Sequence, residues 1–311
     1  MSGTSNASSS KFGGSYRSRI RSTYKRLRLP KSELSLDWAK TNVELTERKE
    51  TILQILKTHH LLTIDQLEYF HPDFGHQSQS QLLLRRDINK LHETFFLDKA
   101  TRKTIKQWDN NIKKTIIVAL GEIGSQYVGW QRHYKRIQHQ NGEVILPKKA
   151  HHILRIHDME IQTRELLKTM DVEIRGWAYE CGNGIVNHEN KLNPDAFCMM
   201  EDQTNGKKYT AFFEYDTGTM DFRKRKKFPE LSQKFRKYKE IQEWKPWYNK
   251  AFSLASENRF PHLFFVTEAE SRFPGIPDML TNMGLKHTVC MQDEFTLHLK
   301  EFIENMRKKN V

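Results

Sequence analysis

The chain has 311 residues, of which 51 are Lys or Arg and 38 are Asp or Glu, so its formal net charge is +13. So large a cationic excess indicates a polyanionic partner, and double-stranded DNA is the one we expect. A composition with 37% hydrophobic and 11% aromatic residues excludes a chain that is disordered throughout. No apolar stretch approaches the roughly 20 residues that span a bilayer, which excludes a transmembrane helix.

The cysteines and the N-terminal composition indicate the compartment. Cys181, Cys198 and Cys290 are scattered and form no C-x-x-C motif, which argues against a disulfide framework and against a zinc ribbon. The first residues contain no apolar core of a secretory signal. We therefore expect a cytoplasmic protein in a reducing environment, with no membrane partner.

Residues 1–41 are predicted to form a flexible basic arm. The first 30 of them contain no acidic residue and seven cations, which are Lys11, Arg17, Arg19, Arg21, Lys25, Arg26 and Arg28. Such a segment can neutralise phosphates and has little apolar surface to bury. The alternative interpretation is a solvated tail without a specific role.

Residues 42–120 have the pattern of three helices. Apolar residues at helical spacing follow Thr46, a candidate N-cap, and Thr63-Ile-Asp-Gln66 matches a capping box. The second helix is expected to end at His71-Pro72, because a proline disfavours helical conformation in the residue before it. The third helix is predicted over 79–92, with three apolar residues facing inward, Leu84, Ile88 and Leu91.

Two apolar segments, 95–97 and 115–119, are strand candidates on either side of a polar, basic stretch, 98–114. Three helices followed by a β-hairpin predict a winged helix-turn-helix domain over 42–120, with 98–114 as its wing. The third helix would then enter the major groove with donors that suit phosphates and purine edges, namely Arg85, Arg86, Asn89 and Lys90. The alternatives are that this charged face is only solvated, or that the domain binds protein.

A glycine-containing connector is predicted over 121–150, with a short helix after Gly121, and a long helix is predicted over 151–170. His151 and His152 are neighbours on the long helix and should point in different directions. Structural zinc normally needs about four convergent ligands, so we interpret both as ordinary surface or capping residues.

Residues 151–311 are predicted to form an α/β domain with a mixed sheet, which makes the whole chain α+β. Strands are expected at 172–179, 191–200 and 208–216, with Pro194-Asp195 in the second and a hairpin turn before the third. Because strand side chains alternate, Glu214 and Asp216 share one face of the third strand. Asp195, Glu214 and Asp216 are therefore candidate oxygen ligands for a divalent ion that would activate water and stabilise phosphoryl oxygens.

A strongly basic segment follows the third strand and contains Arg223, Lys224, Arg225 and Lys226. An amphipathic helix comes next, in which Leu231, Phe235 and Tyr238 face inward and Lys234 is expected on the opposite, basic face. A basic helix beside carboxylates suits a DNA phosphodiester site. It also suits a simple intramolecular charge balance, and the spacing leaves both interpretations open.

These motifs together resemble the plasmid replication-relaxation family of Gram-positive bacteria and their mobile elements. The resemblance rests on the join Leu-Gly-Glu-Ile-Gly-Ser-Gln-Tyr-Val-Gly, the Pro-Asp-Ala-Phe strand, the segment Phe-Phe-Glu-Tyr-Asp-Thr-Gly-Thr and the helix ending Lys-Phe-Arg-Lys-Tyr-Lys-Glu-Ile, and it covers about residues 42–270. It implies a DNA-binding protein that acts in plasmid replication and DNA relaxation. Plasmid replication proteins and a second copy of the chain are the further partners we expect.

The second half also resembles the PD-(D/E)XK nuclease core. The resemblance implies that Asp195 and Glu214 hold Mg²⁺ or Mn²⁺ for metal-dependent DNA nicking, with Asp216 at the position where that motif has Lys. Either Lys224, Lys226 or Lys234 then supplies the missing cation, or the site does not cleave. In the second case the chain would be a winged-helix transcriptional or copy-number regulator with an inactive nuclease-like domain. A tyrosine nucleophile is disfavoured, because alternation turns Tyr215 away from the Glu214 face.

Overall fold

The computed structural model describes residues 34–74, 80–105, 112, 115–130, 137–140, 143–179, 192–217, 230–243 and 260–308. The chain divides into two compact units, residues 1–150 and 151–311, which are described one by one. The predicted basic arm up to residue 33 and the basic segment Arg223–Lys226 lie outside the described residues. The prediction of a mixed α+β chain is confirmed.

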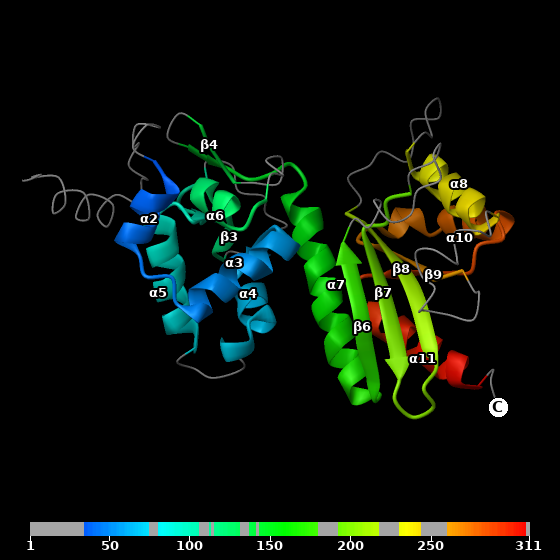
Figure 1. The fold of residues 1–311 in the computed structure, drawn as a ribbon. Helices are drawn as coiled ribbons and strands as arrows, with labels where there is room; N and C mark the ends of the chain where they lie inside the picture. Colours follow the sequence, from blue (N-terminus) through cyan, green and yellow to red (C-terminus); the bar gives the residue numbers. More distant parts are fainter. Residues whose placement is uncertain are drawn as a thin grey trace, which may run out of the picture. The chain divides into compact units, whose positions relative to one another are not determined.

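The first unit combines short helices with a three-stranded antiparallel sheet of order β1-β3-β2 (Figure 1). A separate two-stranded hairpin joins β4 to β5. The helices are α2 (Leu36–Asn42), α3 (Glu47–His59), α4 (Ile64–Phe70), α5 (Ser80–Glu93) and α6 (Glu122–Tyr127), with a 3₁₀ turn at Pro72–Phe74. The strands are β1 (Leu61–Thr63), β2 (Leu97–Ala100), β3 (Ile117–Leu120), β4 (Gln138–Gln140) and β5 (Glu143–Ile145).

The capping box predicted before α4 is confirmed. The backbone N–H of Gln66 donates to the Thr63 hydroxyl at 3.2 Å, and the Gln66 side chain accepts from the backbone N–H of Thr63 at 3.0 Å. The helix ends at Phe70, directly before His71-Pro72. Thr46 occupies the N-cap position of α3, but its hydroxyl makes no capping hydrogen bond. The predicted inward stripe of α5 is also confirmed, because all three of its residues are buried: Leu84, Ile88 and Leu91.

The strand boundaries after α5 differ from the prediction, which placed the first strand at 95–97 and the wing from Asp98. Phe95 has a positive φ of 63° and turns the chain at the end of α5. The strand therefore begins only at Leu97, and Asp98 and Lys99 belong to β2 instead of the wing. The helix α2, the strand β1 and the β4–β5 hairpin were not predicted.

Two glycines allow the segment after β3 to pack closely against the backbone that follows α5. A Cβ atom on Gly121 would lie 2.3 Å from the carbonyl oxygen of Phe95, and one on Gly124 would lie 2.0 Å from that of Phe96. The start of α6 thus rests directly on the backbone that connects α5 to β2. Larger side chains are excluded at both positions, and α6 closes the core formed by α3, α5 and the sheet.

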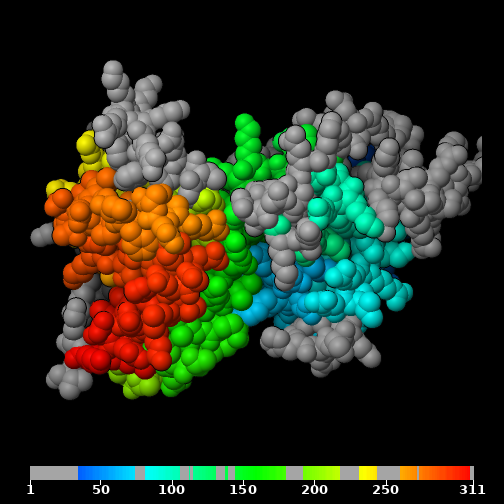
Figure 2. Space-filling model, turned by 180° about the vertical axis from the view of Figure 1, so that it is seen from behind, coloured from blue at the N-terminus to red at the C-terminus, as the bar shows by residue number. Residues whose placement is uncertain are grey.

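The second unit is a five-stranded mixed sheet of order β10-β9-β8-β7-β6 with helices on both faces. The antiparallel strands are β6 (Val172–Tyr179), β7 (Ala196–Asp202) and β8 (Lys208–Asp216), and β9 (His262–Thr267) and β10 (His287–Met291) continue parallel to β8. The helices are α7 (Ala150–Thr169), α8 (Glu230–Glu243), α10 (Ile276–Asn282) and α11 (Phe295–Lys308). Figure 2 shows the segment from β9 to α11, in orange and red, on the surface of this unit.

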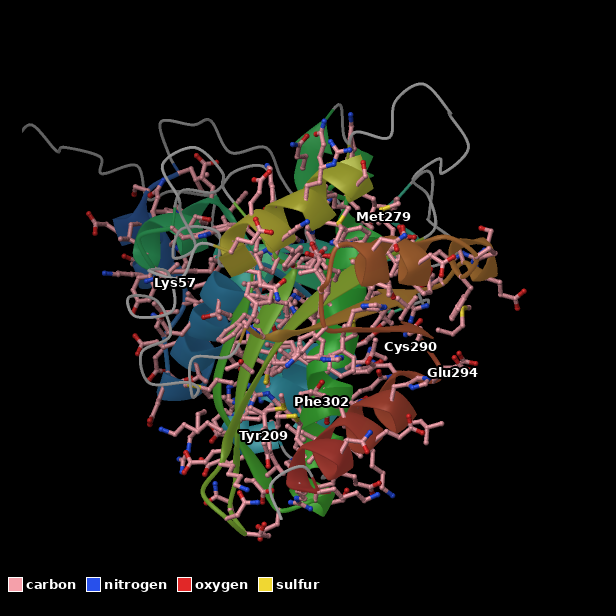
Figure 3. All side chains as sticks on the ribbon, turned by 90° about the vertical axis from the view of Figure 1, so that its right-hand side faces the viewer. Lys57, Tyr209, Met279, Cys290, Glu294 and Phe302 are labelled. Carbon is pink, nitrogen blue, oxygen red and sulfur yellow. The ribbon has the colours of Figure 1, made fainter. Side chains whose placement is uncertain are left out.

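The two faces of the sheet carry separate cores. One core packs α7 and α11 against Phe213 and Tyr215 of β8, and the other packs α8 and α10 against Phe212 of the same strand. Figure 3 shows Phe302 of α11 near Tyr209 of β8, whereas Met279 of α10 lies beside α8. The predicted alternation along β8 is therefore confirmed, and Glu214 lies on the α8 side.

The helix α11 was not predicted. Its last turn is anchored by Arg307, which donates to both carboxylate oxygens of Asp202 at 2.6 and 3.0 Å. Asp202 is fully buried at the end of β7. This ion pair fixes the C-terminal helix to the hairpin that leads into β8.

Candidate functional site

Strand pairing brings the two predicted metal-binding carboxylates together. Asp195 directly precedes β7, and the antiparallel register pairs the next residue, Ala196, with Phe213 of β8. Asp195 therefore lies beside the end of β8 that carries Glu214. The backbone N–H of Tyr215 donates to Asp195 Oδ2 at 2.9 Å, which fixes the carboxylate against this strand.

Lys234 of α8 lies between the two carboxylates. Its Nζ is 3.3 Å from Asp195 Oδ1 and also donates to Glu214 Oε2. The expectation that Lys234 lies on the outer basic face of the helix is wrong. Positions three and four apart share a helix face, so Lys234 belongs to the same stripe as Leu231 and Tyr238. We call Asp195, Glu214 and Lys234 the carboxylate–lysine cluster.

Tyr238 provides the second hydrogen bond from α8 to Glu214. Its hydroxyl donates to Glu214 Oε1, so each oxygen of this buried carboxyl has a partner from α8. The Tyr238 side chain is fully buried and packs edge-on against Phe212. Tyr238 was predicted only as a core residue, although its spacing of four from Lys234 places both on one turn facing the same strand.

His152 also reaches the cluster, which the sequence did not predict. Its Nε2 lies 3.4 Å from Asp195 Oδ1, and its ring packs edge-on against Tyr215. The interpretation of the histidine pair as surface or capping residues is wrong, since His151 is buried and lies 3.1 Å from Glu268 Oε1. The two rings do point to different partners, as expected for adjacent helical residues.

Asp216, the third predicted carboxylate, is buried on the same face of β8 as Glu214. Its Oδ2 accepts from the hydroxyl of Thr267, which is its register partner on β9, at 3.3 Å. This contact directs the carboxylate toward the neighbouring strand, whereas Asp195 approaches from β7 on the other side.

On the opposite face, Tyr215 belongs to a different polar group. Its hydroxyl oxygen lies 2.8 Å from Glu268 Oε1 and 2.9 Å from Gln292 Oε1, within hydrogen-bond distance of both, and Arg155 contacts the same Glu268 oxygen. Burial and the neighbouring Glu268 raise the pKa of Tyr215 above its usual value. This orientation agrees with the predicted alternation, which turns Tyr215 away from the Glu214 face and disfavours it as a nucleophile there.

The two carboxyls of the cluster differ strongly in acidity. Burial opposes ionisation of Asp195, but Lys234 and His152 outweigh it and hold the pKa of Asp195 well below its usual range. Burial and the nearby Asp195 charge raise the pKa of Glu214 to about 8, although Lys234 acts against them. Burial alone would lower the pKa of Lys234, but the two carboxylates raise it. The cluster therefore holds a charged Asp195–Lys234 pair beside a carboxyl that retains its proton near neutral pH.

A pH-dependent stability follows from Glu214. In the unfolded chain it titrates near 4.5, so between pH 4.5 and 8 the folded protein holds a proton that the unfolded chain has released. Stability should then fall as the pH rises through this window, by at most about 1.4 kcal/mol per pH unit from this group. We expect Glu214→Gln to remove this slope and Glu173→Gln, at an exposed position, to keep it. Urea unfolding from pH 5 to 8 measures the slopes, and equal slopes in wild type and Glu214→Gln would contradict the assignment.

The cluster fits a divalent ion only in part. Two carboxylates can hold Mg²⁺ or Mn²⁺ when water and substrate phosphate supply the other ligands. Lys234 Nζ, however, contacts an oxygen of each carboxylate, where an ion would bind. Among the described residues no group of three or more His, Cys, Asp or Glu side chains is arranged to hold a metal ion. A metal could enter only if the lysine withdrew.

The predicted DNA-binding residues of α5 belong to the first unit. Arg85, Arg86 and Asn89 are exposed, and Lys90 is partly exposed. Lys99 of β2 donates to Asn89 Oδ1 at 2.7 Å, so the amide nitrogen of Asn89 is directed away from that contact. The predicted contacts from the basic arm and from Arg223–Lys226 fall outside the described residues.

Comparison with known proteins gives one match. A sequence model of the replication-relaxation family matches residues 53–254, a range that includes α5, Asp195, Glu214 and Lys234. Curated proteins and solved structures yield no match to the chain. None of the described helices is long and apolar enough to cross a membrane.

Proposed function

The chain belongs to the replication-relaxation family, and on that premise we propose that it binds double-stranded DNA during replication and relaxation of a bacterial plasmid or mobile element. The observation that carries the proposal is the exposed face of α5, with Arg85, Arg86 and Asn89 on a compact helix–sheet unit. An excess of 13 positive charges supports it, because a cationic surface attracts the phosphate backbone.

We propose that residues 42–120 of the first unit form a winged helix. Three helices, α3, α4 and α5, precede the antiparallel pair β2–β3, and β1 completes the sheet. In such domains the third helix reads the major groove, and arginines and amides recognise purine edges there. Arg85, Arg86 and Asn89 supply those groups in this chain, and Lys99 orients the amide of Asn89.

Replacing Arg86 and Lys90 together with Ala tests this assignment. The slope of log K against log salt is negative, and each lost phosphate contact should make it less steep by about 0.9. Affinity for duplex DNA should fall as well. Fluorescence anisotropy of a labelled duplex across a salt series measures both quantities. Lys57→Ala, at an exposed position on α3, serves as the control. If the double variant bound with unchanged affinity and slope, α5 would not be the DNA-binding helix.

For the second unit we propose metal-dependent nicking of DNA at the carboxylate–lysine cluster. Asp195 and Glu214 would hold Mg²⁺ or Mn²⁺, which supplies an activated water and neutralises phosphoryl charge. Lys234 would leave the carboxylates and contact the phosphate, in place of the lysine that Asp216 replaces in the nuclease motif. Tyr238 would keep Glu214 oriented through its hydroxyl, and the backbone N–H of Tyr215 would do the same for Asp195.

A second candidate is a transcriptional or copy-number regulator that binds DNA through α5 and does not cleave it. It is favoured by the contacts of Lys234, because an ammonium already bound to Asp195 and Glu214 neutralises the site without a metal. Cleavage of supercoiled plasmid in Mg²⁺ or Mn²⁺ separates the two candidates. Nicked or relaxed product supports the enzyme, and DNA binding without product supports the regulator.

A further inference from the structure

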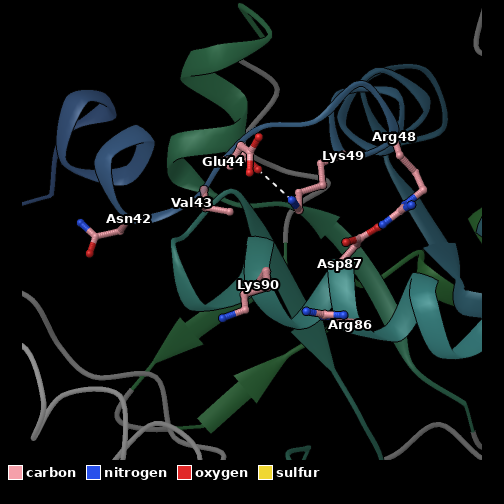
Figure 4. Close-up of a pocket in the computed structure, with 8 residues that line it drawn as sticks. All are labelled: Asn42, Val43, Glu44, Arg48, Lys49, Arg86, Asp87 and Lys90. Atoms are coloured by element: carbon pink, nitrogen blue, oxygen red, sulfur yellow. Dashed lines mark hydrogen bonds and ion pairs between the residues drawn. The ribbon is translucent and has the colours of Figure 1, made fainter.

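The first unit contains a pocket whose lining extends beyond α5, the predicted recognition helix, to residues of α3 and of the turn before it. It has a volume of about 380 Å³ and lies between the turn after α2, the start of α3 and the middle of α5 (Figure 4). Its charged lining residues are Glu44, Arg48, Lys49, Arg86, Asp87 and Lys90. Four of these are cations and two are acids, so the pocket has a net positive lining drawn from two helices.

One wall of the pocket is an internal ion pair. Arg48 Nε lies 2.5 Å from Asp87 Oδ2, and the Asp87 side chain is almost fully buried. The hydrogen bond that Arg48 donates to Asp87 raises the pKa of Arg48 above its usual value. The backbone carbonyl of Arg48 also contacts buried His71 at 3.0 Å. Arg48 and Asp87 therefore fix α3 against α5 and neutralise each other.

The remaining cations are available to a ligand. Lys49 Nζ donates to the backbone carbonyl oxygen of Glu44 at 2.7 Å (Figure 4), a neutral partner that leaves the ammonium charge uncompensated. Lys90 approaches Glu93 only at 3.9 Å. Within the described part of the chain, Arg86 has no ion pair with a carboxylate. Three cations from two helices thus border one open cavity.

We propose that this pocket binds a backbone phosphate of the duplex whose groove α5 enters, with Lys49 of α3 as the contact outside α5. The inference rests on the proposed DNA binding. A phosphate attracts guanidinium and ammonium donors that approach from different directions, and a pocket of this size has room for the phosphate and part of its sugar. Arg86 and Lys90 border both the pocket and the predicted groove-facing surface, so the phosphate would lie at the edge of that groove.

The test compares two lysines of the same helix. Lys49 lines the pocket, whereas Lys57 is exposed two turns further along α3 and does not line it. In the full chain, Lys49→Gln should weaken binding of a labelled duplex roughly fivefold to tenfold at 0.1 M salt. It should also make the negative slope of log K against log salt less steep by about 0.9. Lys57→Gln should change affinity by no more than about twofold, because an exposed distant charge is largely screened.

A second variant removes a negative charge and should therefore raise DNA affinity, a result that loss of folding would not produce. Glu44→Gln removes an exposed carboxylate from the pocket and should tighten duplex binding. Glu122→Gln removes an exposed carboxylate of α6 that does not line the pocket, and it should leave affinity nearly unchanged. Thermal unfolding of all four variants checks that the fold is retained.

The outcomes separate this inference from the proposed function. If the wild-type chain binds no duplex, the proposed function fails and the pocket assignment fails with it. If the wild type binds and Arg86→Ala weakens binding, but Lys49→Gln behaves like Lys57→Gln, only the pocket assignment is overturned. Inorganic phosphate provides the remaining comparison. If it stabilises the wild type but not Lys49→Gln, while both bind duplex equally well, the pocket takes a small anion and the backbone-phosphate assignment is wrong.

Discussion

Replacing Lys234 with Met is expected to lower the unfolding free energy of the second unit by about 3 kcal/mol at neutral pH, the lower end of the range for breaking a buried ion pair. Lys234 contacts Asp195 and Glu214, whose side chains are only 15% and 4% exposed. Without the ammonium, Asp195 loses the cation that keeps it ionised beside a second carboxyl. Urea unfolding followed by circular dichroism measures the loss.

Lys239→Met provides the matched control, since Lys239 lies on the same helix and is 46% exposed. It should change stability by less than about 0.5 kcal/mol, as surface substitutions usually do. Mn²⁺ should stabilise Lys234→Met more than it stabilises the wild type, because the carboxylates become free to bind the ion. A Lys234→Met protein as stable as the wild type, with the same response to Mn²⁺, would show that the lysine does not balance the cluster.

The pairing of Asp195 with Glu214 could be predicted from the sequence for a simple physical reason. Strand periodicity identified the segments that became β7 and β8, and the short turn between them required antiparallel neighbours. The antiparallel register of β7 and β8 then places the residues at the start of β7 beside those at the end of β8, as the pair Ala196 and Phe213 shows. Alternation fixed the face on which Glu214 lies.

The remaining members of the site required the tertiary structure. His152 approaches Asp195 from a helix that precedes β6, and no local pattern relates their positions along the chain. Lys234 and Tyr238 do carry a signal, because their spacing of four places them on one face with the apolar stripe of α8. A lysine on such a stripe indicates a buried acidic partner more directly than it indicates a solvated surface.

The parts of the fold that were missed are mostly short. Strands of three residues such as β1, β4 and β5 contain too few side chains to show a period of two, and the seven residues of α2 form barely two turns. The start of β2 was misplaced because Phe95 turns the chain through a positive φ, which a β-prone apolar residue does not signal. For α11 a signal exists, since Phe295, Leu299 and Ile303 recur every four residues and are all buried.

Loss of either predicted metal-binding carboxyl should stop DNA cleavage completely. Asp195→Asn and Glu214→Gln should each abolish nicking of supercoiled plasmid in Mg²⁺ or Mn²⁺ and leave duplex affinity nearly unchanged, because binding is assigned to α5 in the other unit. Both substitutions keep the side-chain shape and remove a carboxyl group that can bind a metal in its ionised form. Gel analysis of supercoiled, nicked and relaxed plasmid measures the activity, and anisotropy measures the binding.

Asp278→Asn is the control for this pair, because Asp278 is exposed on α10 of the same unit. It should cleave as the wild type does. Lys234→Met should bind the ion and still cleave poorly, since the cation that would steady the phosphate is then missing. If the wild type cleaves and Glu214→Gln cleaves equally well, the chemistry belongs to another site. If the wild type binds duplex but yields no product with either ion, Lys234 has the role of a permanent counter-ion, and the regulator becomes the supported function.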